Sequence, residues 1–198
     1  YECLERLHGR YPDLLFEACS GGGGRFEMGM LYYTPQIWCS DGTDAIDRIQ
    51  VQHGTSFVYP PCTVGAHVSA VPNHQTGRSV DLKTRGVAAM AGSFGYELDL
   101  SLLSDEEKEE VREQVRTYKK YGHLLINGDY YRLHTPGKDT EAAAWAFVSK
   151  DKAEAVVSIV SLDSHGHEPT TYIRRKGLRR DRMYRCDETG ETYSGAVL

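Results

Sequence analysis

The apolar residues of this chain occur in two patterns. Some form short continuous runs, and others recur at helical spacing. Four short apolar or aromatic runs bounded by turn residues predict strands at Leu14–Ala18, Gln36–Cys39, Thr63–Ala70 and Ser93–Asp99. Helical spacing predicts helices at Tyr1–Tyr11, Asp44–His53 and Leu82–Ala91, with a loop at Val71–Arg78. Helix and strand that recur about every 20–30 residues indicate parallel strands joined by crossover helices.

A longer helix is predicted at Ser104–Gly122, because Ser104 and Glu107 form a capping box and acidic residues crowd its first turns. After it the pattern changes to short β-rich runs separated by Gly, Pro, Asp and Asn. The runs are His123–Ile126, Asp129–His134, Ala142–Ser149, Ala155–Leu162 and Thr170–Arg174, and a hairpin follows at Met183–Tyr193. We therefore divide the chain into an α/β part, residues 1–121, and an antiparallel β-domain, residues 122–198.

Polar residues that follow the first two predicted strands indicate where a site lies. Cys19 and Ser20 follow the first strand, and Ser40 and Asp41 follow the second. In α/β folds, the ends of buried strands deliver the polar side chains of active sites. No glycine-rich dinucleotide fingerprint with a downstream acidic residue is present, so the barrel form of the α/β fold is favoured over the doubly wound form.

The composition and net charge of the chain limit the kinds of molecule that it is expected to bind. The 198 residues are 40% hydrophobic and 26% charged, with a formal net charge of −5. This balance argues against nucleic acid or an anionic membrane as partner, because both need clustered positive charge. Five scattered cysteines without a CxxC pair favour reduced thiols in a cytoplasmic protein. No long apolar run is present, and a chain that starts inside a predicted helix indicates a fragment.

Four consecutive glycines, Gly21–Gly24, follow the first predicted strand. Their backbone amides are able to cradle a phosphate, but the Lys-Ser/Thr pair of a P-loop is absent. Glycine lets a ligand approach the backbone closely, so we favour a ligand wall over a merely flexible loop.

The segment that ends the second predicted strand holds an indole and two carboxylates within seven residues, Trp38 to Asp44. An aromatic ring beside a carboxylate suits sugar chemistry, since the ring packs on a pyranose while the carboxyl reaches an oxygen. Asp44 is interpreted as a helix N-cap in preference to a catalytic group. His67 is assigned a supporting or core position in preference to a catalytic one, and His165-Gly166-His167 is too short and isolated to predict a metal site.

Four blocks of this chain, FEACSGGGGRFEMGMLYY, WCSDGTDAIDR, YPPCTVGAHVSAVPNHQTGR and LKTRGVAAMAGSFGYELDL, resemble consecutive blocks of the glycoside hydrolase family 36 α-galactosidases. The resemblance implies the second half of a (β/α)8 barrel followed by a C-terminal antiparallel β-domain. It also implies a retaining exo-enzyme that acts on terminal α-galactosides of the melibiose or raffinose type. The family needs no metal, nucleotide or other cofactor, and many members are homo-oligomers.

By this resemblance Asp41 occupies the acid/base position, and Trp38, Cys19, Gly21 and Gly22 line the galactose pocket. Gly42 stands where many relatives carry Asn, which we expect to affect only the local loop. The family's nucleophile is an aspartate in a Lys-Trp-Asp type motif, whereas the tryptophans here, Trp38 and Trp145, lie outside any such motif. The chain by itself is therefore expected to be inactive.

Two alternatives remain open at this stage. Galactosyl transfer, with a sugar hydroxyl replacing water, uses the same residues as the hydrolysis. A catalytically inactive sugar-binding fragment explains the same pocket without any reaction. The sequence does not separate these readings, nor does it set the aglycone preference.

Overall fold

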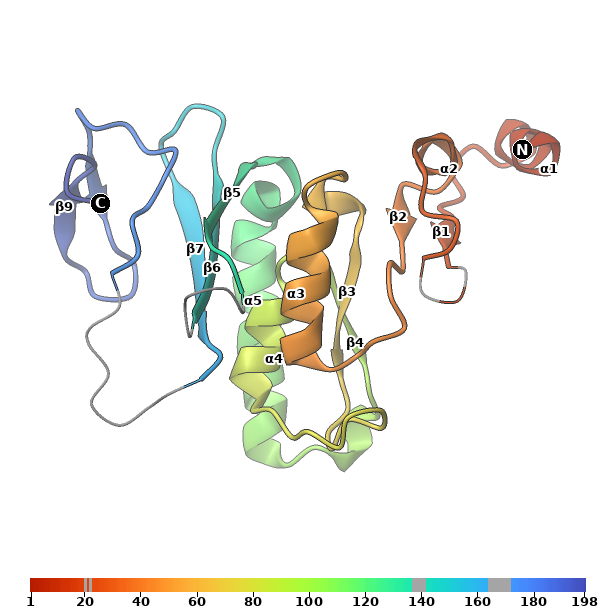
Figure 1. The fold of residues 1–198 in the computed structure, drawn as a ribbon, viewed down its shortest axis with the longest axis horizontal. Helices are drawn as coiled ribbons and strands as arrows, with labels where there is room; N and C mark the ends of the chain where they lie inside the picture. The colour runs from red at the N-terminus through yellow and green to blue at the C-terminus, as the bar shows by residue number, and fades with distance from the viewer. Residues whose placement is uncertain (20, 22, 137–141, 164–171) are drawn as a thin grey trace. The chain divides into compact units, whose positions relative to one another are not determined.

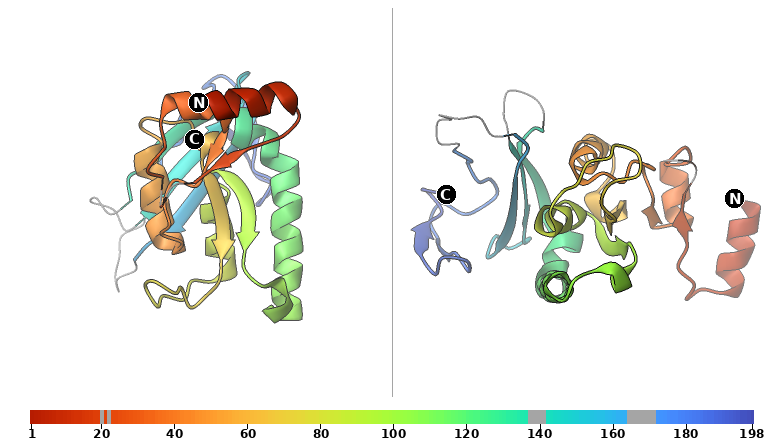
Figure 2. Two further views of the ribbon diagram at one scale, coloured as in Figure 1. Left: turned by 90° about the vertical axis from the view of Figure 1, so that its right-hand side faces the viewer. Right: turned by 90° about the horizontal axis from the view of Figure 1, so that it is seen from below.

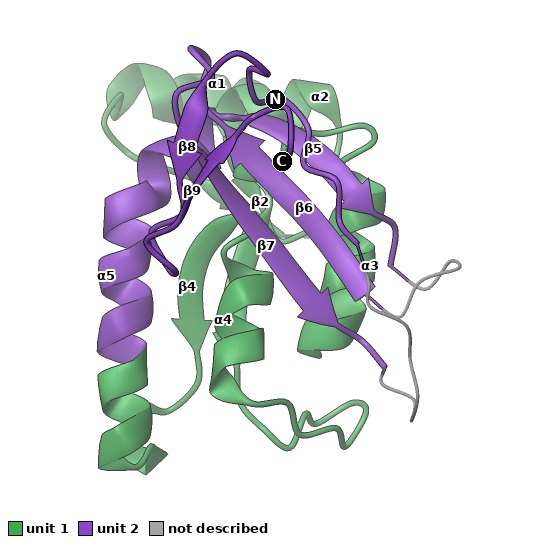
Figure 3. Ribbon diagram, turned by 90° about the vertical axis from the view of Figure 1, so that its left-hand side faces the viewer, with its two compact units in different colours: residues 1–110 green, residues 111–198 purple. Residues whose placement is uncertain are grey.

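The computed structural model describes the whole chain except residues 20, 22, 137–141 and 164–171. The described chain forms two compact units, Tyr1–Glu110 and Val111–Leu198 (Figure 3). The first unit contains α1 (Glu2–Arg10), β1 (Glu17–Ala18), α2 (Met28–Tyr33), β2 (Gln36–Ile37), α3 (Ala45–Thr55), β3 (Gly65–Ser69), α4 (Leu82–Ala89) and β4 (Ser93–Glu97) (Figure 1). The helix α5 (Asp105–Asn127) begins in the first unit and ends in the second, which also holds β5 (Asp129–His134), β6 (Ala142–Val148), β7 (Ala155–Ser161), β8 (Met183–Arg185) and β9 (Thr192–Ser194).

The strands of the first unit pair in parallel, as the sequence pattern predicts. Strand β1 pairs with β2, and β3 pairs with β4 through the register Gly65↔Ser93 to Ser69↔Glu97. A further parallel bridge joins Ile37 to Val64. The left view of Figure 2 shows β3 and β4 running side by side in the same direction. The chain thus contains a mixed α/β unit built from helix-strand repeats.

The first predicted strand is wrong at its N-terminal end. Only Glu17 and Ala18 form β1, whereas Leu15 is 84% exposed in this structure. The apolar run Leu14–Phe16 suggested burial, but β1 pairs only where Glu17 and Ala18 face β2. The second predicted strand is also shorter, although the Trp38 amide still donates to the Ala18 carbonyl at 2.8 Å.

Local capping explains where the helices of the first unit begin. The Asp44 carboxylate accepts hydrogen bonds from the amides of Ile46, at 2.9 Å, and Asp47, at 3.4 Å, so it is the N-cap of α3. The Asp81 carboxylate caps α4 by accepting from the Thr84 amide at 2.8 Å. Helix α4 packs against both β3 and α3. The core so formed contains Ile37, Ile49, Val64, Ala66, Val68, Ala88 and Ala89.

The helix α2 has no counterpart among the predicted elements. Its six residues, Met28–Tyr33, follow an N-cap at Glu27, whose carboxylate accepts from the Gly29 amide at 2.8 Å. A single short turn of helix carries too few residues to show a periodic apolar stripe. The spacing of apolar residues therefore does not predict this helix.

Helix α5 continues beyond its predicted end at Gly122 and includes His123–Ile126, which the sequence pattern had assigned to a β-run. Its predicted capping box is confirmed: the Ser104 amide donates to Glu107 Oε2 at 2.9 Å, and the Glu107 amide donates to Ser104 Oγ at 3.2 Å. Gly122 was predicted to end the helix, but Leu124 and Leu125 beyond it are buried. Their packing stabilises the helix past this glycine. The helix ends before Gly128, where a Cβ would lie 2.5 Å from the Leu124 carbonyl oxygen.

The second unit contains the antiparallel sheet β5-β6-β7 that the sequence predicts (Figure 3). All seven residues of the central strand β6, Ala142–Val148, are buried. The predicted hairpin is confirmed as β8 and β9, with Gly190 at φ +73° in the connection. The predicted run Thr170–Arg174 is not a strand over its described residues 172–174, and its first two residues lie outside the described chain.

Candidate active site

The glycine-rich loop after β1 lies directly against the end of β2. Gly23 adopts φ +88°, and a Cβ there would lie 2.7 Å from the Cys39 carbonyl oxygen. Gly21 also has positive φ, at +55°. Both conformations favour glycine, and at Gly23 the close approach requires it. Cys19 is exposed in this loop, and its carbonyl accepts from Arg25 Nη2 at 2.8 Å. Gly22, the remaining predicted residue of the loop, lies outside the described chain.

Trp38 follows β2 and packs against two cationic or titratable side chains. The imidazole of His67, on β3, stacks on the indole with a centroid distance of 4.8 Å and an interplanar angle of 18°. The guanidinium of Arg48 lies over the same ring, 4.5 Å from its centroid. His67 therefore contacts a predicted site residue, and it helps to fix the orientation of the indole.

Arg48 ties the end of β2 to the start of β3 from a buried position. Its Nη2 donates to the Gly65 carbonyl at 2.6 Å, and its Nη1 donates to the Ser40 carbonyl at 3.2 Å and contacts Cys39 Sγ at 3.8 Å. Burial lowers the pKa of Arg48, and the neighbouring Cys39 opposes that effect. The sequence pattern indicates no role for Arg48, because an arginine in an amphipathic helix usually faces solvent.

Asp41 lies immediately beyond this anchored segment. Its side chain is exposed, and among the described residues none hydrogen-bonds its carboxylate. Its backbone is held, however, because Gln75 Nε2 donates to the Asp41 carbonyl at 3.0 Å. A fixed backbone with an unengaged carboxyl leaves that group available to a ligand.

Asp44, three residues later, is engaged within the protein and does not serve as a free carboxylate. In addition to capping α3, it accepts from Thr76 Oγ1 at 2.6 Å and from Arg78 Nη1 at 2.5 Å. Burial pushes the pKa of Asp44 upward, but the hydrogen bonds from Thr76, Arg78 and the helix amides outweigh it, so this pKa lies below its usual value. The interpretation of Asp44 as an N-cap is confirmed.

We expect Asp44→Ala to destabilise the protein by roughly 1–3 kcal/mol, because it removes the α3 cap and the buried acceptor that Thr76 and Arg78 share. Since the folded-state pKa is depressed, the carboxylate contributes its stability above its unfolded value of about 4, and the contribution is lost as the pH falls through the folded-state pKa. Melting temperatures of parent and variant, measured from pH 7 down to pH 3, should therefore converge at low pH. A gap that stays constant over this range would contradict the prediction.

The segment from Asn73 to Arg78 was predicted only as a loop, yet it provides most of the contacts to the Asp41–Asp44 loop. Asn73 Nδ2 donates to Thr43 Oγ1 at 2.9 Å, and the Thr43 amide donates to Gln75 Oε1 at 3.3 Å. The only signal in the sequence was a concentration of amide and hydroxyl side chains after a strand. Such a concentration is common in ordinary loops, so spacing could not identify the contact.

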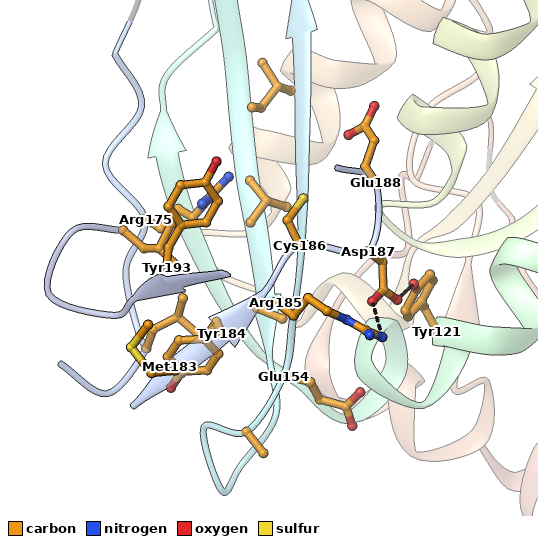
Figure 4. A pocket seen from close by; sticks show the side chains of 16 residues that line it. Tyr121, Glu154, Arg175, Met183, Tyr184, Arg185, Cys186, Asp187, Glu188 and Tyr193 are labelled. Atoms are coloured by element: carbon orange, nitrogen blue, oxygen red, sulfur yellow. Dashed lines mark hydrogen bonds and ion pairs between the residues drawn. The ribbon is translucent and has the colours of Figure 1, made fainter. Parts of the chain in front are cut away.

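A separate pocket of about 420 Å³ lies in the second unit (Figure 4). The Asp187 carboxylate, at its lining, accepts from Tyr121 at 2.7 Å and from Lys120 at 2.9 Å, and it lies 3.8 Å from the guanidinium of Arg185. None of the predicted site residues lines it. Within the described chain, no group of three or more His, Cys, Asp or Glu side chains is placed to hold a metal ion, and no helix has the length and apolar character to cross a membrane.

Two family descriptions match this chain. The Melibiase family matches residues 1–128, and the C-terminal domain of glycosyl hydrolase family 36 matches residues 142–198. The bifunctional α-galactosidase/sucrose kinase AgaSK of Mediterraneibacter gnavus is 59% identical over the whole chain, and the α-galactosidase AgaA of Geobacillus stearothermophilus is 49% identical. The chain spans only 21% and 27% of the lengths of these two relatives.

Solved structures give the same result. The galactosidase domain of AgaSK superimposes with a TM-score of 0.97 at 58% identity, covering 100% of this chain and 27% of that one. A variant of AgaA in complex with raffinose superimposes with a TM-score of 0.95 at 48% identity, covering 99% of this chain and 27% of that one. The matches extend over both units with high identity. The chain therefore belongs to glycoside hydrolase family 36, the family of these α-galactosidases.

Proposed function

We propose that this chain supplies the acid/base half of the active site of a retaining exo-α-galactosidase. The reaction is hydrolysis of terminal α-D-galactosyl bonds in oligosaccharides of the melibiose and raffinose type. One observation carries the proposal: Asp41 presents an exposed carboxylate, without a hydrogen-bond partner among the described residues, from a backbone that Gln75 holds. Solved relatives in complex with raffinose and with stachyose support the choice of substrate class.

Double displacement assigns two consecutive tasks to Asp41. Its protonated carboxyl gives a proton to the glycosidic oxygen as the bond to the aglycone breaks and a carboxylate nucleophile bonds to the anomeric carbon. Asp41, now ionised, then takes a proton from the water that displaces this nucleophile. The two carboxyl groups of such a pair lie about 5–5.5 Å apart.

The nucleophile of this reaction lies outside residues 1–198 in our proposal. Trp38 precedes Cys39 and Trp145 precedes Ala146, so neither tryptophan belongs to a Lys-Trp-Asp type motif. We therefore assign catalysis to the protein that contains this segment together with the remaining length of its relatives. Residues 1–121 form the second half of its (β/α)8 barrel, residues 122–198 form its C-terminal β-domain, and the whole protein is a homo-oligomer.

Around the galactose we place Trp38, Cys19, Gly21 and Gly22. Gly23 supports this arrangement, because its contact with Cys39 brings the glycine-rich loop against the end of β2. The imidazole of His67 and the guanidinium of Arg48 already lie over the indole of Trp38. Less of the ring face is therefore free for a sugar, and we expect the edge of the indole to make the contact.

The experiment that tests this function uses the whole protein and raffinose. Proton NMR of the first product should show α-galactose, which then mutarotates, because double displacement retains the anomeric configuration. β-Galactose as first product, or no hydrolysis, would overturn the proposal. Galactosylated raffinose as the main product at high raffinose concentration would favour transfer instead.

A second measurement addresses the chain by itself. Purified residues 1–198 should give no detectable turnover of an aryl α-galactoside, because one of the two required carboxylates is absent. Coexpression of this chain with the remaining part of the protein, as a second polypeptide, should restore activity. Turnover by the pure chain would show that our account of the nucleophile is wrong.

A further inference from the structure

A single side chain bridges the backbone on both sides of Gly42, directly after Asp41. Gln75 Nε2 donates to the Asp41 carbonyl at 3.0 Å, and Gln75 Oε1 accepts from the Thr43 amide at 3.3 Å. A backbone carbonyl only accepts and an amide N–H only donates, so both bonds require the carboxamide in this orientation. Neither an acid nor a shorter amide at position 75 reproduces the pair.

We propose that Gln75 is a positioning residue for the Asp41 carboxyl, an inference that rests on the proposed function. It acts on the backbone from which Asp41 projects and touches neither substrate nor reacting atoms. Proton transfer requires the carboxyl within hydrogen-bond reach of the glycosidic oxygen. A displacement of about 1 Å at such a group is able to cost on the order of 10²-fold in rate.

Gly42 explains why the loop needs an external support. Glycine loses more conformational freedom on ordering than other residues, so a glycine directly after Asp41 loosens the segment. Within the loop, the Gly42 amide donates a hydrogen bond to Ser40 Oγ at 3.1 Å. The two hydrogen bonds of Gln75 hold Asp41 and Thr43, the residues on either side of this glycine.

Gln75 is itself held in place by its neighbour Asn73. The carboxamide oxygen of Asn73 accepts from the amides of Gln75, at 2.9 Å, and Thr76, at 3.1 Å. Its Nδ2 group donates to Thr43 Oγ1 at 2.9 Å, and the residue is only 4% exposed. The Gln75 backbone is therefore tied to the same loop that its side chain supports.

The other end of this segment is fastened to the start of α3. Thr76 and Arg78 both donate to the buried Asp44 carboxylate, and Arg78 also reaches Asp47 at 3.2 Å. A helix N-terminus is a rigid reference for the loop that precedes it. The segment from Asn73 to Arg78 is thus anchored to the N-terminus of α3, and Gln75 links this segment to the backbone of Asp41.

The test compares Gln75→Ala and Gln75→Glu in the whole protein with the same substitutions at Gln50. Gln50 is a matched control because it is exposed on α3 and its side chain has no hydrogen-bond partner among the described residues. We expect Gln75→Ala to lower kcat/KM for raffinose by roughly 10- to 100-fold. The value for 4-nitrophenyl α-galactoside should fall by less than about threefold, because its leaving group needs little protonation.

Gln75→Glu keeps the acceptor for Thr43 and loses the donor to Asp41, so we expect an intermediate loss. It also carries the test should Gln75→Ala fail to fold, which melting temperatures report. Equal losses on both substrates would mean that Gln75 only stabilises the fold or binds the sugar, and the inference would be wrong.

A double-mutant cycle with Asp41→Asn separates this inference from the proposed function. Once the acid is removed, Gln75→Ala should cause little further loss on raffinose, because it acts through Asp41. Additive losses would overturn the positioning role and leave the function intact. If Asp41→Asn itself lost activity equally on both substrates, the acid/base assignment would fall instead.

Discussion

Asp41→Asn in the whole protein is expected to lower kcat/KM for raffinose or melibiose by on the order of 10²–10⁴, the usual contribution of a general acid. Asparagine is nearly isosteric, and the Asp41 side chain has no hydrogen-bond partner among the described residues, so the fold should be preserved. The loss should therefore appear in the chemistry and not in the melting temperature.

The dependence on the leaving group identifies the chemical role. For 4-nitrophenyl α-galactoside, kcat/KM should fall far less, because the phenolate leaves without a proton. Added azide should accelerate turnover of the aryl substrate, since azide attacks the galactosyl-enzyme without a general base. Asp13→Asn is the matched control: Asp13 is exposed, and its side chain has no hydrogen-bond partner among the described residues. Equal losses on both substrates, without azide rescue, would show that Asp41 is not the acid/base.

Arg48→Met is expected to produce the largest loss of stability. Arg48 is 3% exposed and donates to the carbonyls of Gly65 and Ser40. Methionine fills part of the volume but leaves both acceptors without their partner, at roughly 1–3 kcal/mol for each one that stays buried. A total near 3 kcal/mol corresponds to a fall in melting temperature of roughly 6 °C or more.

The same substitution should also lower activity, because Arg48 lies over Trp38 and holds the carbonyl that precedes Asp41. Arg48→Lys keeps the charge but lacks the planar fork, so it should restore only part of the stability. Arg6→Met serves as control, since the Arg6 side chain is 81% exposed. A melting temperature for Arg48→Met within about 2 °C of the parent would contradict the prediction.

Much of the local structure followed from the sequence. The caps at Asp44 and at Ser104 with Glu107 depend on residues within three positions of each other, so local chemistry specifies them. The positions of β3, β4 and the β6-β7 pair also followed, because each is a short run that contains apolar or aromatic residues and lies between turn residues. The parallel direction of β3 and β4 followed from the helix predicted between them, whereas the helix between β1 and β2, α2, was not predicted.

Where prediction failed, burial decided against local pattern. Leu15 lies in an apolar run but is exposed, and Gly122 lies inside α5 because Leu124 and Leu125 beyond it are buried. Helix propensity differs by only about 1 kcal/mol between glycine and alanine, so two buried leucines readily outweigh it. The spacing of apolar residues along the chain does not weigh the helix propensity of a glycine against the burial of its neighbours.

The sequence by itself determined the family, most of the helix-strand order and the candidate residues Asp41, Trp38 and Cys19, because these depend on local motifs and on blocks of identity. Only the tertiary structure decided how those residues are held. Gln75 and Asp41 are 34 positions apart, and Arg48 and Gly65 are 17 apart. Side-chain contacts over such separations arise from packing of whole elements, and no periodic pattern along the chain encodes them.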